Sequence, residues 1–173
     1  LGIESSLTIN GIIDDKKHFW SKGGIKKGDH ILISRSLGTG IIFSAFMNGK
    51  VRPHILDSVL EEMNKSQHEI VTYINQVKNN QNSGIINACT DITGFGLLGH
   101  LSEMLDSTNN YQLKMNLEPV KIILELNNIP VYSGVKDLLS KGFESSLAPS
   151  NQIFLKNING DKNLRLELIY NEF

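Results

Sequence analysis

The chain has 173 residues, of which 40% are hydrophobic and 20% are charged, and this balance predicts a soluble globular protein with a core of its own. The formal net charge of −1 gives no electrostatic basis for binding nucleic acid or a membrane surface. The sequence has no run of about 18 apolar residues, so no transmembrane helix is predicted. The single cysteine excludes an internal disulfide and fits a reducing, cytoplasmic compartment.

The first third of the chain is predicted to contain two strands. Leu7, Ile9 and Ile12 alternate with polar residues within 1–14, and a short apolar strand follows at 30–34. The chain begins at Leu1 without a methionine and has no visible signal peptide, so we expect a piece of a longer protein, cut at both ends.

Three helices are predicted next. The turn Leu37-Gly38-Thr39-Gly40 leads into a helix over 41–48, and its Gly and Thr are interpreted either as neighbours of a phosphate or, more simply, as a cap. Pro53 begins a helix that reaches about residue 63. A capping box from Ser66 to Glu69 begins the third.

The centre of the chain combines an acidic turn with glycines. A strand at 85–89 precedes Asp91, Thr93, Gly94 and Gly96, and leucines at helical spacing follow. This order places a carboxylate and bare backbone N–H groups at the start of a helix, where anions bind. A carboxylate there can also hold Mg²⁺ against a phosphate. The alternative is structural, since Asp, Thr and Gly are also ordinary cap and turn residues.

The same glycines spell a dinucleotide-binding pattern. Gly94, Gly96 and Gly99 form G-x-G-x-x-G, and Glu118 lies near the acidic position expected after a second strand. The polar entry through Asp91 and Thr93 counts against this interpretation, because Asp91 would lie beside a pyrophosphate.

The last third is predicted to add two strands and two helices. A strand follows the central helix at 111–117, Pro119 opens a helix over 120–126, a short helix covers 134–140, and a strand covers 164–170. Strands and helices interleave without strict alternation, which predicts an α+β domain with helices packed on a mixed β-sheet, as one domain over residues 1–173.

Two motifs resemble one enzyme family. ACTDITGFGLLGHLSEM, at 88–104, is similar to the TDVTGFGLLGHL motif of selenophosphate synthetases (selenide, water dikinases), and GDHILISRSLGTG, at 28–40, is similar to their GDxLILTKPLGTG. The resemblance covers most of residues 7–103. It implies the C-terminal domain shared with aminoimidazole ribonucleotide synthetase, usually dimeric, with ATP bound between domains.

The resemblance also implies a reaction and a division of labour. Enzymes of this family use ATP, Mg²⁺, water and selenide to make selenophosphate, AMP and phosphate. Asp91 matches the metal-binding aspartate of the motif, and Thr93, Gly94 and Gly96 are expected to let the backbone approach the ATP phosphates. The reactive Cys or selenocysteine and its Lys belong to an N-terminal domain that this chain does not contain, so no catalytic residue is assigned and the chain alone is expected to be inactive.

Some features depart from the family pattern. Arg35-Ser36 stands where the common sequence is Lys-Pro, and a DPQTSGG-type segment is absent before Phe173. Cys89 is interpreted as an ordinary core residue. Two alternatives therefore stay open: a sister or fused, diverged ATP-using enzyme of the same superfamily, and a non-catalytic binding or dimerisation domain.

Overall fold

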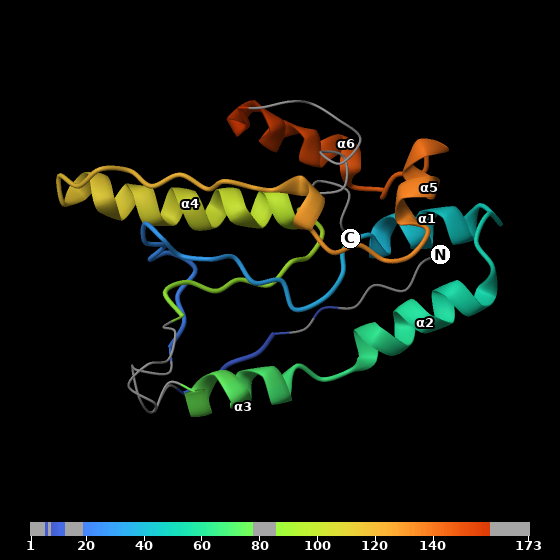
Figure 1. The fold of residues 1–173 in the computed structure, drawn as a ribbon, viewed down its shortest axis with the longest axis horizontal. Coiled ribbons are helices and arrows are strands. Elements are labelled where there is room, and N and C mark those ends of the chain that lie inside the picture. Colours follow the sequence, from blue (N-terminus) through green and yellow to red (C-terminus); the bar gives the residue numbers. More distant parts are fainter. Residues whose placement is uncertain (1–5, 7, 13–18, 78–85, 160–173) are drawn as a thin grey trace.

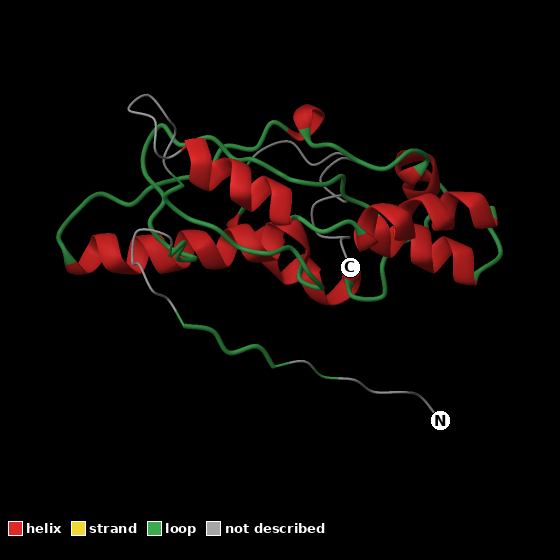
Figure 2. Cartoon of the chain, turned by 90° about the horizontal axis from the view of Figure 1, so that it is seen from below, coloured by secondary structure: helices red, strands yellow, loops and turns green. Residues whose placement is uncertain are grey.

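The computed structural model describes residues 6, 8–12, 19–77 and 86–159 (Figure 1). Regular structure in these ranges is helical, and Figure 2 draws it as helices joined by loops. The elements are α1 (Thr39–Met47), α2 (Pro53–Asn64), α3 (His68–Val77), α4 (Gly96–Lys114), η2 (Leu126–Asn128), α5 (Val135–Ser140), α6 (Ala148–Asn151) and η3 (Gln152–Asn157). No helix in the described ranges is long and apolar enough to cross a membrane.

The predicted mixed β-sheet is wrong for the described part of the chain. Its only strand-like pairing there is an isolated parallel bridge between Leu37 and Val131. Segments outside the helices at 19–37, 86–95 and 117–125 run beside α4 (Figure 1). They form no regular ladder with one another, and polar side chains of α4 bond to the backbone of each of them instead. Alternating apolar residues predict that one side of a segment is buried, but they do not by themselves predict that the segment pairs with another strand.

Thr108 and Asn109 on α4 show how helix side chains act as hydrogen-bond partners where strand neighbours were expected. The buried Thr108 Oγ1 accepts N–H bonds from Gly24 at 3.0 Å and Ile25 at 3.3 Å, and donates to the Met104 carbonyl at 2.8 Å. The Asn109 side chain accepts the Val120 N–H at 2.8 Å and donates to the Val120 carbonyl at 3.1 Å. Buried backbone groups need partners, and here a helix supplies them in place of a strand.

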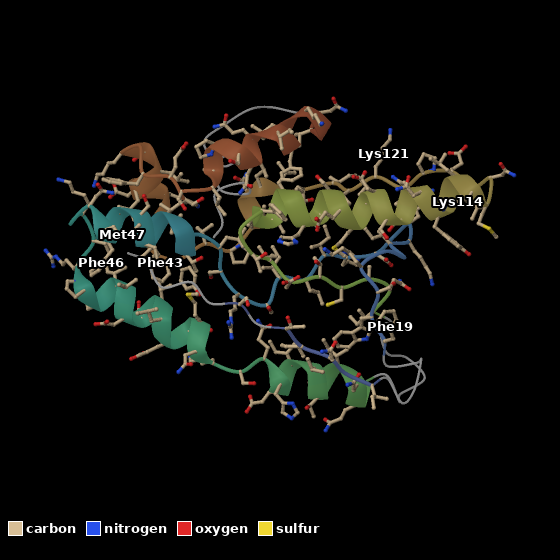
Figure 3. The ribbon with its side chains drawn as sticks, turned by 180° about the vertical axis from the view of Figure 1, so that it is seen from behind. Phe19, Phe43, Phe46, Met47, Lys114 and Lys121 are labelled. Atoms are coloured by element: carbon tan, nitrogen blue, oxygen red, sulfur yellow. The ribbon has the colours of Figure 1, made fainter. Side chains whose placement is uncertain are left out.

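Two predicted elements around the end of α4 are also wrong. The segment 111–117 is not a strand, because α4 continues to Lys114 with Tyr111 and Leu113 63% and 61% exposed. The predicted helix over 120–126 is extended: Ile122 and Leu124 pack against the core while Ile123 is 87% exposed. Figure 3 shows Lys121 directed away from α4. The segment therefore has the two-residue period of an extended chain.

The core consists of two clusters. The first surrounds the N-terminal half of α4, and its buried members are Leu37, Leu97, Leu98, Leu101, Met104 and Ala148. The second joins α1, α2 and α5, and its buried members are Ile41, Ile42, Ala45, Val59, Val135, Leu138 and Leu139. Val131 packs against both clusters, so the Leu37–Val131 bridge lies where they meet.

The predicted helices of the first half are confirmed. α1 begins at Thr39 instead of residue 41, α2 begins at Pro53, and α3 begins at His68, whose N–H donates to the Ser66 hydroxyl at 3.1 Å. The short helix expected at 134–140 is α5. The strand expected at 164–170, and much of the one expected within 1–14, lie outside the described residues.

Candidate functional site at the start of α4

The approach to α4 is a turn built around Gly96. Residues 86–93 have no regular structure, and the Gly96 N–H donates to the Thr93 carbonyl at 2.9 Å. Gly96 has φ +68°, which a side chain would strain. α4 therefore begins at Gly96, and Asp91 lies before it, outside any helix.

The predicted site residues differ in solvent exposure, and so in how accessible they are to a ligand. Asp91 and Thr93 are exposed, Gly94 is half-buried, and Gly96 is buried with its N–H already bonded. Phe95 between the glycines is 51% exposed. Asp91, Thr93 and Gly94 thus share one accessible turn, while Gly96 contributes the conformation of that turn.

His100 holds this turn on the helix. The Thr93 N–H donates to His100 Nε2 at 3.0 Å, and the Thr93 hydroxyl lies 3.1 Å from the same nitrogen. The His100 ring is 4% exposed and lies on the buried N-terminal half of α4. Because Nε2 accepts a hydrogen bond, the neutral ring carries its proton on Nδ1.

The other side of the His100 ring faces a carboxylate. Nδ1 is buried and lies 3.5 Å from Glu103 Oε2, beyond ordinary hydrogen-bond length. The same Glu103 oxygen lies 2.6 Å from Lys22 Nζ. The hydrogen bond from Lys22 holds the pKa of the Glu103 carboxyl below its usual range, while the nearby Asp91 charge acts in the opposite sense. A continuous series of contacts thus runs from Lys22 to the turn.

Cys89 lies just before the turn and is exposed. Partial burial of its sulfur, and then the Asp91 carboxylate, raise the pKa of the Cys89 thiol. A raised pKa keeps the thiol protonated near neutral pH, which is the opposite of what a nucleophile needs. The interpretation of Cys89 as an ordinary core residue is wrong, because the residue is exposed.

Close packing explains two glycines of the G-x-G-x-x-G pattern. A Cβ on Gly94 would lie 2.7 Å from Leu147 Cδ1, and the Gly94 carbonyl accepts a 2.7 Å bond from Asn151 Nδ2. A Cβ on Gly99 would lie 2.6 Å from Phe95 Cβ and 3.0 Å from Phe154 Cε2, so the missing side chain lets Phe95 and η3 pack against α4. With no strand before this turn in the described residues, the dinucleotide-binding interpretation gains no support.

Two other features lie away from this turn. Arg35 donates from its guanidinium to the Met63 carbonyl at 3.1 Å and to the Lys65 carbonyl, so it caps the C-terminal end of α2. An open hollow on the surface is lined by Leu60, Glu61, Met63 and Asn64, and does not include Asp91. The Arg35-Ser36 departure therefore has a structural explanation that involves no ligand.

Metal-ligating side chains are sparse around Asp91. The described residues contain no group of three or more His, Cys, Asp or Glu side chains arranged to hold a metal ion. A dedicated protein cage is thus absent from this part of the chain. Mg²⁺ often binds without one, through one or two carboxylates together with substrate phosphates and water. A single exposed Asp91 carboxylate fits that mode.

Sequence reasoning identified Asp91, Thr93 and the glycines but missed His100, Glu103 and Lys22. One signal for His100 was available: a polar residue among Leu97, Leu98 and Leu101, on the face that the helical spacing already assigned to the core. A histidine there needs a partner. Lys22, 81 residues before Glu103, carried no such signal.

Comparison with known proteins identifies the relatives of this chain. A selenide, water dikinase of Treponema denticola is 31% identical over 150 residues, covering 86% of this chain and 37% of that protein. Those of Bdellovibrio bacteriovorus (27% over 154 residues, 89% of this chain and 39% of that protein) and Caldanaerobacter subterraneus (30% over 154 residues, 87% and 38%) are also similar. The chain spans less than two fifths of the length of these relatives.

These matches confirm the resemblance that the two motifs indicated. The family model described as AIR synthase related protein, C-terminal domain, matches residues 26–144, which include the turns before α1 and α4. The match covers more than half of the chain. This chain belongs to the family of AIR synthase related protein, C-terminal domain.

Proposed function

We propose that this chain is the C-terminal part of a selenide, water dikinase, which transfers phosphoryl groups from ATP to give selenophosphate, AMP and phosphate. Relatives of that name match 86–89% of the chain. The missing N-terminal part would supply the reactive residues, and the complete enzyme would be a cytoplasmic homodimer with ATP bound between domains. The chain alone would have only part of the active site.

The observation that carries the proposal for a site is the exposure of Asp91 and Thr93 at the start of α4. An exposed carboxylate, and an exposed threonine whose hydroxyl contacts His100, lie just before the N-terminal end of a 19-residue helix. That end has a positive partial charge, which favours a phosphate nearby. A purely structural cap would hold its side chains against the helix, whereas Asp91 accepts no cap bond from the first turn of α4.

Each residue of the turn has a proposed role. Asp91 ligates Mg²⁺, Thr93 offers its hydroxyl to a phosphate oxygen, and Gly94 lets the phosphate approach the backbone. Gly96 shapes the turn. The magnesium ion would supply positive charge against the phosphates as they are transferred.

The test is Asp91→Asn in the full-length protein. The amide keeps the size of the side chain and removes its charge. Selenide-dependent AMP formation should fall by on the order of 10²-fold or more, the scale of losing one strong electrostatic group at a transition state. Raising the Mg²⁺ concentration should restore part of the activity, and thermal melting should change little.

Asp106→Asn is the matched control. Asp106 is an exposed carboxylate on α4 itself, and its loss should leave both the rate and the Mg²⁺ requirement unchanged. Near-normal turnover of Asp91→Asn with an unchanged Mg²⁺ requirement would contradict the metal assignment.

A further inference from the structure

The buried His100 is the feature of the site that the proposed function does not use. Its ring is 4% exposed, yet its Nε2 accepts a bond from a turn whose side chains are exposed. A histidine in a helix core costs free energy unless its nitrogens have partners. Both nitrogens here face polar groups, one on the turn and one on Glu103.

The direction of these contacts matters. The Thr93 N–H donates to Nε2 at 3.0 Å and the Thr93 hydroxyl oxygen lies 3.1 Å from the same atom, so one ring atom contacts both the backbone and the side chain of Thr93. Thr93 is two residues from Asp91 and three from Gly96, where the helix begins. Fixing Thr93 therefore limits where the Asp91 carboxylate lies relative to the start of α4.

Glu103 and Lys22 lie on the other side of the ring, close to Nδ1 but without a hydrogen bond to it. Glu103 Oε2 faces the Nδ1 proton at 3.5 Å and is held by Lys22 at 2.6 Å. A carboxylate facing one histidine nitrogen sets which nitrogen is left free to accept. The contacts lead from a surface lysine to the turn through one buried ring.

We propose that His100 is a positioning residue that holds residues 91–93 against α4 and so sets the affinity of the Asp91 carboxylate for a divalent cation. The inference rests on the proposed function, because it gives Asp91 the metal. His100 itself touches neither metal nor substrate. Groups that orient a metal ligand in this way typically change metal affinity by about 10- to 100-fold when they are removed.

The experiment compares His100→Leu with His100→Gln in the full-length protein. Leucine fills the space without offering an acceptor to the Thr93 N–H. Glutamine keeps an acceptor oxygen near the position of Nε2. Two quantities are measured: Mn²⁺ binding by electron paramagnetic resonance, and amide hydrogen exchange of a peptide covering residues 91–95.

His100→Leu should weaken Mn²⁺ binding by on the order of 10-fold and speed exchange at residues 91–95. His100→Gln should restore most of both. Thr93→Val, which removes the hydroxyl but keeps the N–H, should leave exchange near that of the unchanged protein. Unchanged Mn²⁺ affinity or unchanged exchange in His100→Leu would overturn the inference.

A surface variant keeps the test decisive if His100→Leu does not fold. Glu103→Gln changes a side chain that is 40% exposed and should weaken Mn²⁺ binding by about threefold, a smaller effect than loss of the ring itself. Unchanged binding there would also overturn the inference.

The experiments distinguish failure of the two proposals. If Asp91→Asn has normal activity, the metal assignment is wrong. If Asp91→Asn is inactive and His100→Leu binds Mn²⁺ normally, only the role of His100 is wrong.

Discussion

The starts of α1 and α4 have similar sequences but differ in burial. At each helix start a threonine stands beside two closely spaced glycines, Gly38-Thr39-Gly40 at α1 and Thr93-Gly94-Phe95-Gly96 at α4. At α1, Leu37 is 3% and Thr39 8% exposed, and Leu37 bonds on both sides to residues 130–132. At α4, Asp91 and Thr93 are exposed. A helix start with closely spaced glycines is thus a buried structural turn at α1 and an accessible turn at α4.

The difference comes from what packs on each turn. A Cβ on Gly38 would lie 2.5 Å from Val135 Cγ2, because α5 covers the start of α1 (Figure 1). On Gly94 the nearest atom is the end of Leu147, a side chain that is 42% exposed and free to move. Surroundings, and not the glycine motif, distinguish a structural turn from a candidate ligand site.

The largest expected effect tests the closed turn. Gly38 has φ +111°, so Gly38→Ala adds a left-handed strain of about 1–2 kcal/mol and a clash of about 1–3 kcal/mol with Val135. We expect a loss of about 2–5 kcal/mol, measured by urea unfolding of the full-length protein. Gly49→Ala is the control: φ is +67°, nothing lies within 4 Å, and only the strain should appear. Equal losses in the two variants would contradict the packing argument.

The second effect tests the open turn. Gly94 has no positive φ and one mobile neighbour, so Gly94→Ala should cost less than about 1 kcal/mol of stability. If a phosphate approaches the Gly94 backbone, losing one charge-assisted hydrogen bond should raise the KM for ATP by on the order of 10-fold. The measurements are thermal melting and steady-state kinetics of the full-length enzyme. An unchanged KM would leave Gly94 with a packing role only.

The sequence predicted the local parts of this molecule well. Pro53, the Ser66 capping box and the leucine spacing after Gly96 each depend on neighbours within one or two turns, and α2, α3 and α4 begin where these signals lie. The position of Asp91, Thr93 and the glycines before a helix could be predicted for the same reason, whereas their role toward a ligand stays a prediction. Their order along the chain is enough to place them at a helix start.

What failed depends on partners far away in the sequence. The alternation at 111–117 lies on an exposed end of α4, and the apolar run before residue 126 is held extended by Asn109 through Val120. In the described residues no sheet is seen, and the backbone groups of Gly24, Ile25 and Val120 bond to Thr108 and Asn109 of α4 instead of to strand neighbours. His100 was missed because its partners are a backbone N–H and a carboxylate that is held by Lys22.

The smallest expected effect concerns the Lys22–Glu103 ion pair, which lies beside His100 near the open turn. The depressed pKa of Glu103 means that its stabilising effect is complete above its ordinary pKa of 4.5 and is lost as pH falls through the lower value in the folded protein. Lys22→Met should therefore reduce stability at pH 7, by less than about 1 kcal/mol because both side chains are 40% or more exposed, and the difference should vanish in acid.

Lys141→Met is the matched control for this variant. The Lys141–Asp137 pair on α5 has the same 2.6 Å separation and is more exposed. Both variants lose one surface ion pair, so their melting points should fall by similar small amounts at pH 7. Only Lys22→Met should speed amide exchange at residues 91–95, because only Lys22 reaches the turn through Glu103 and His100. Faster exchange there in both variants would mean that the open turn responds to overall stability and not to this series of contacts.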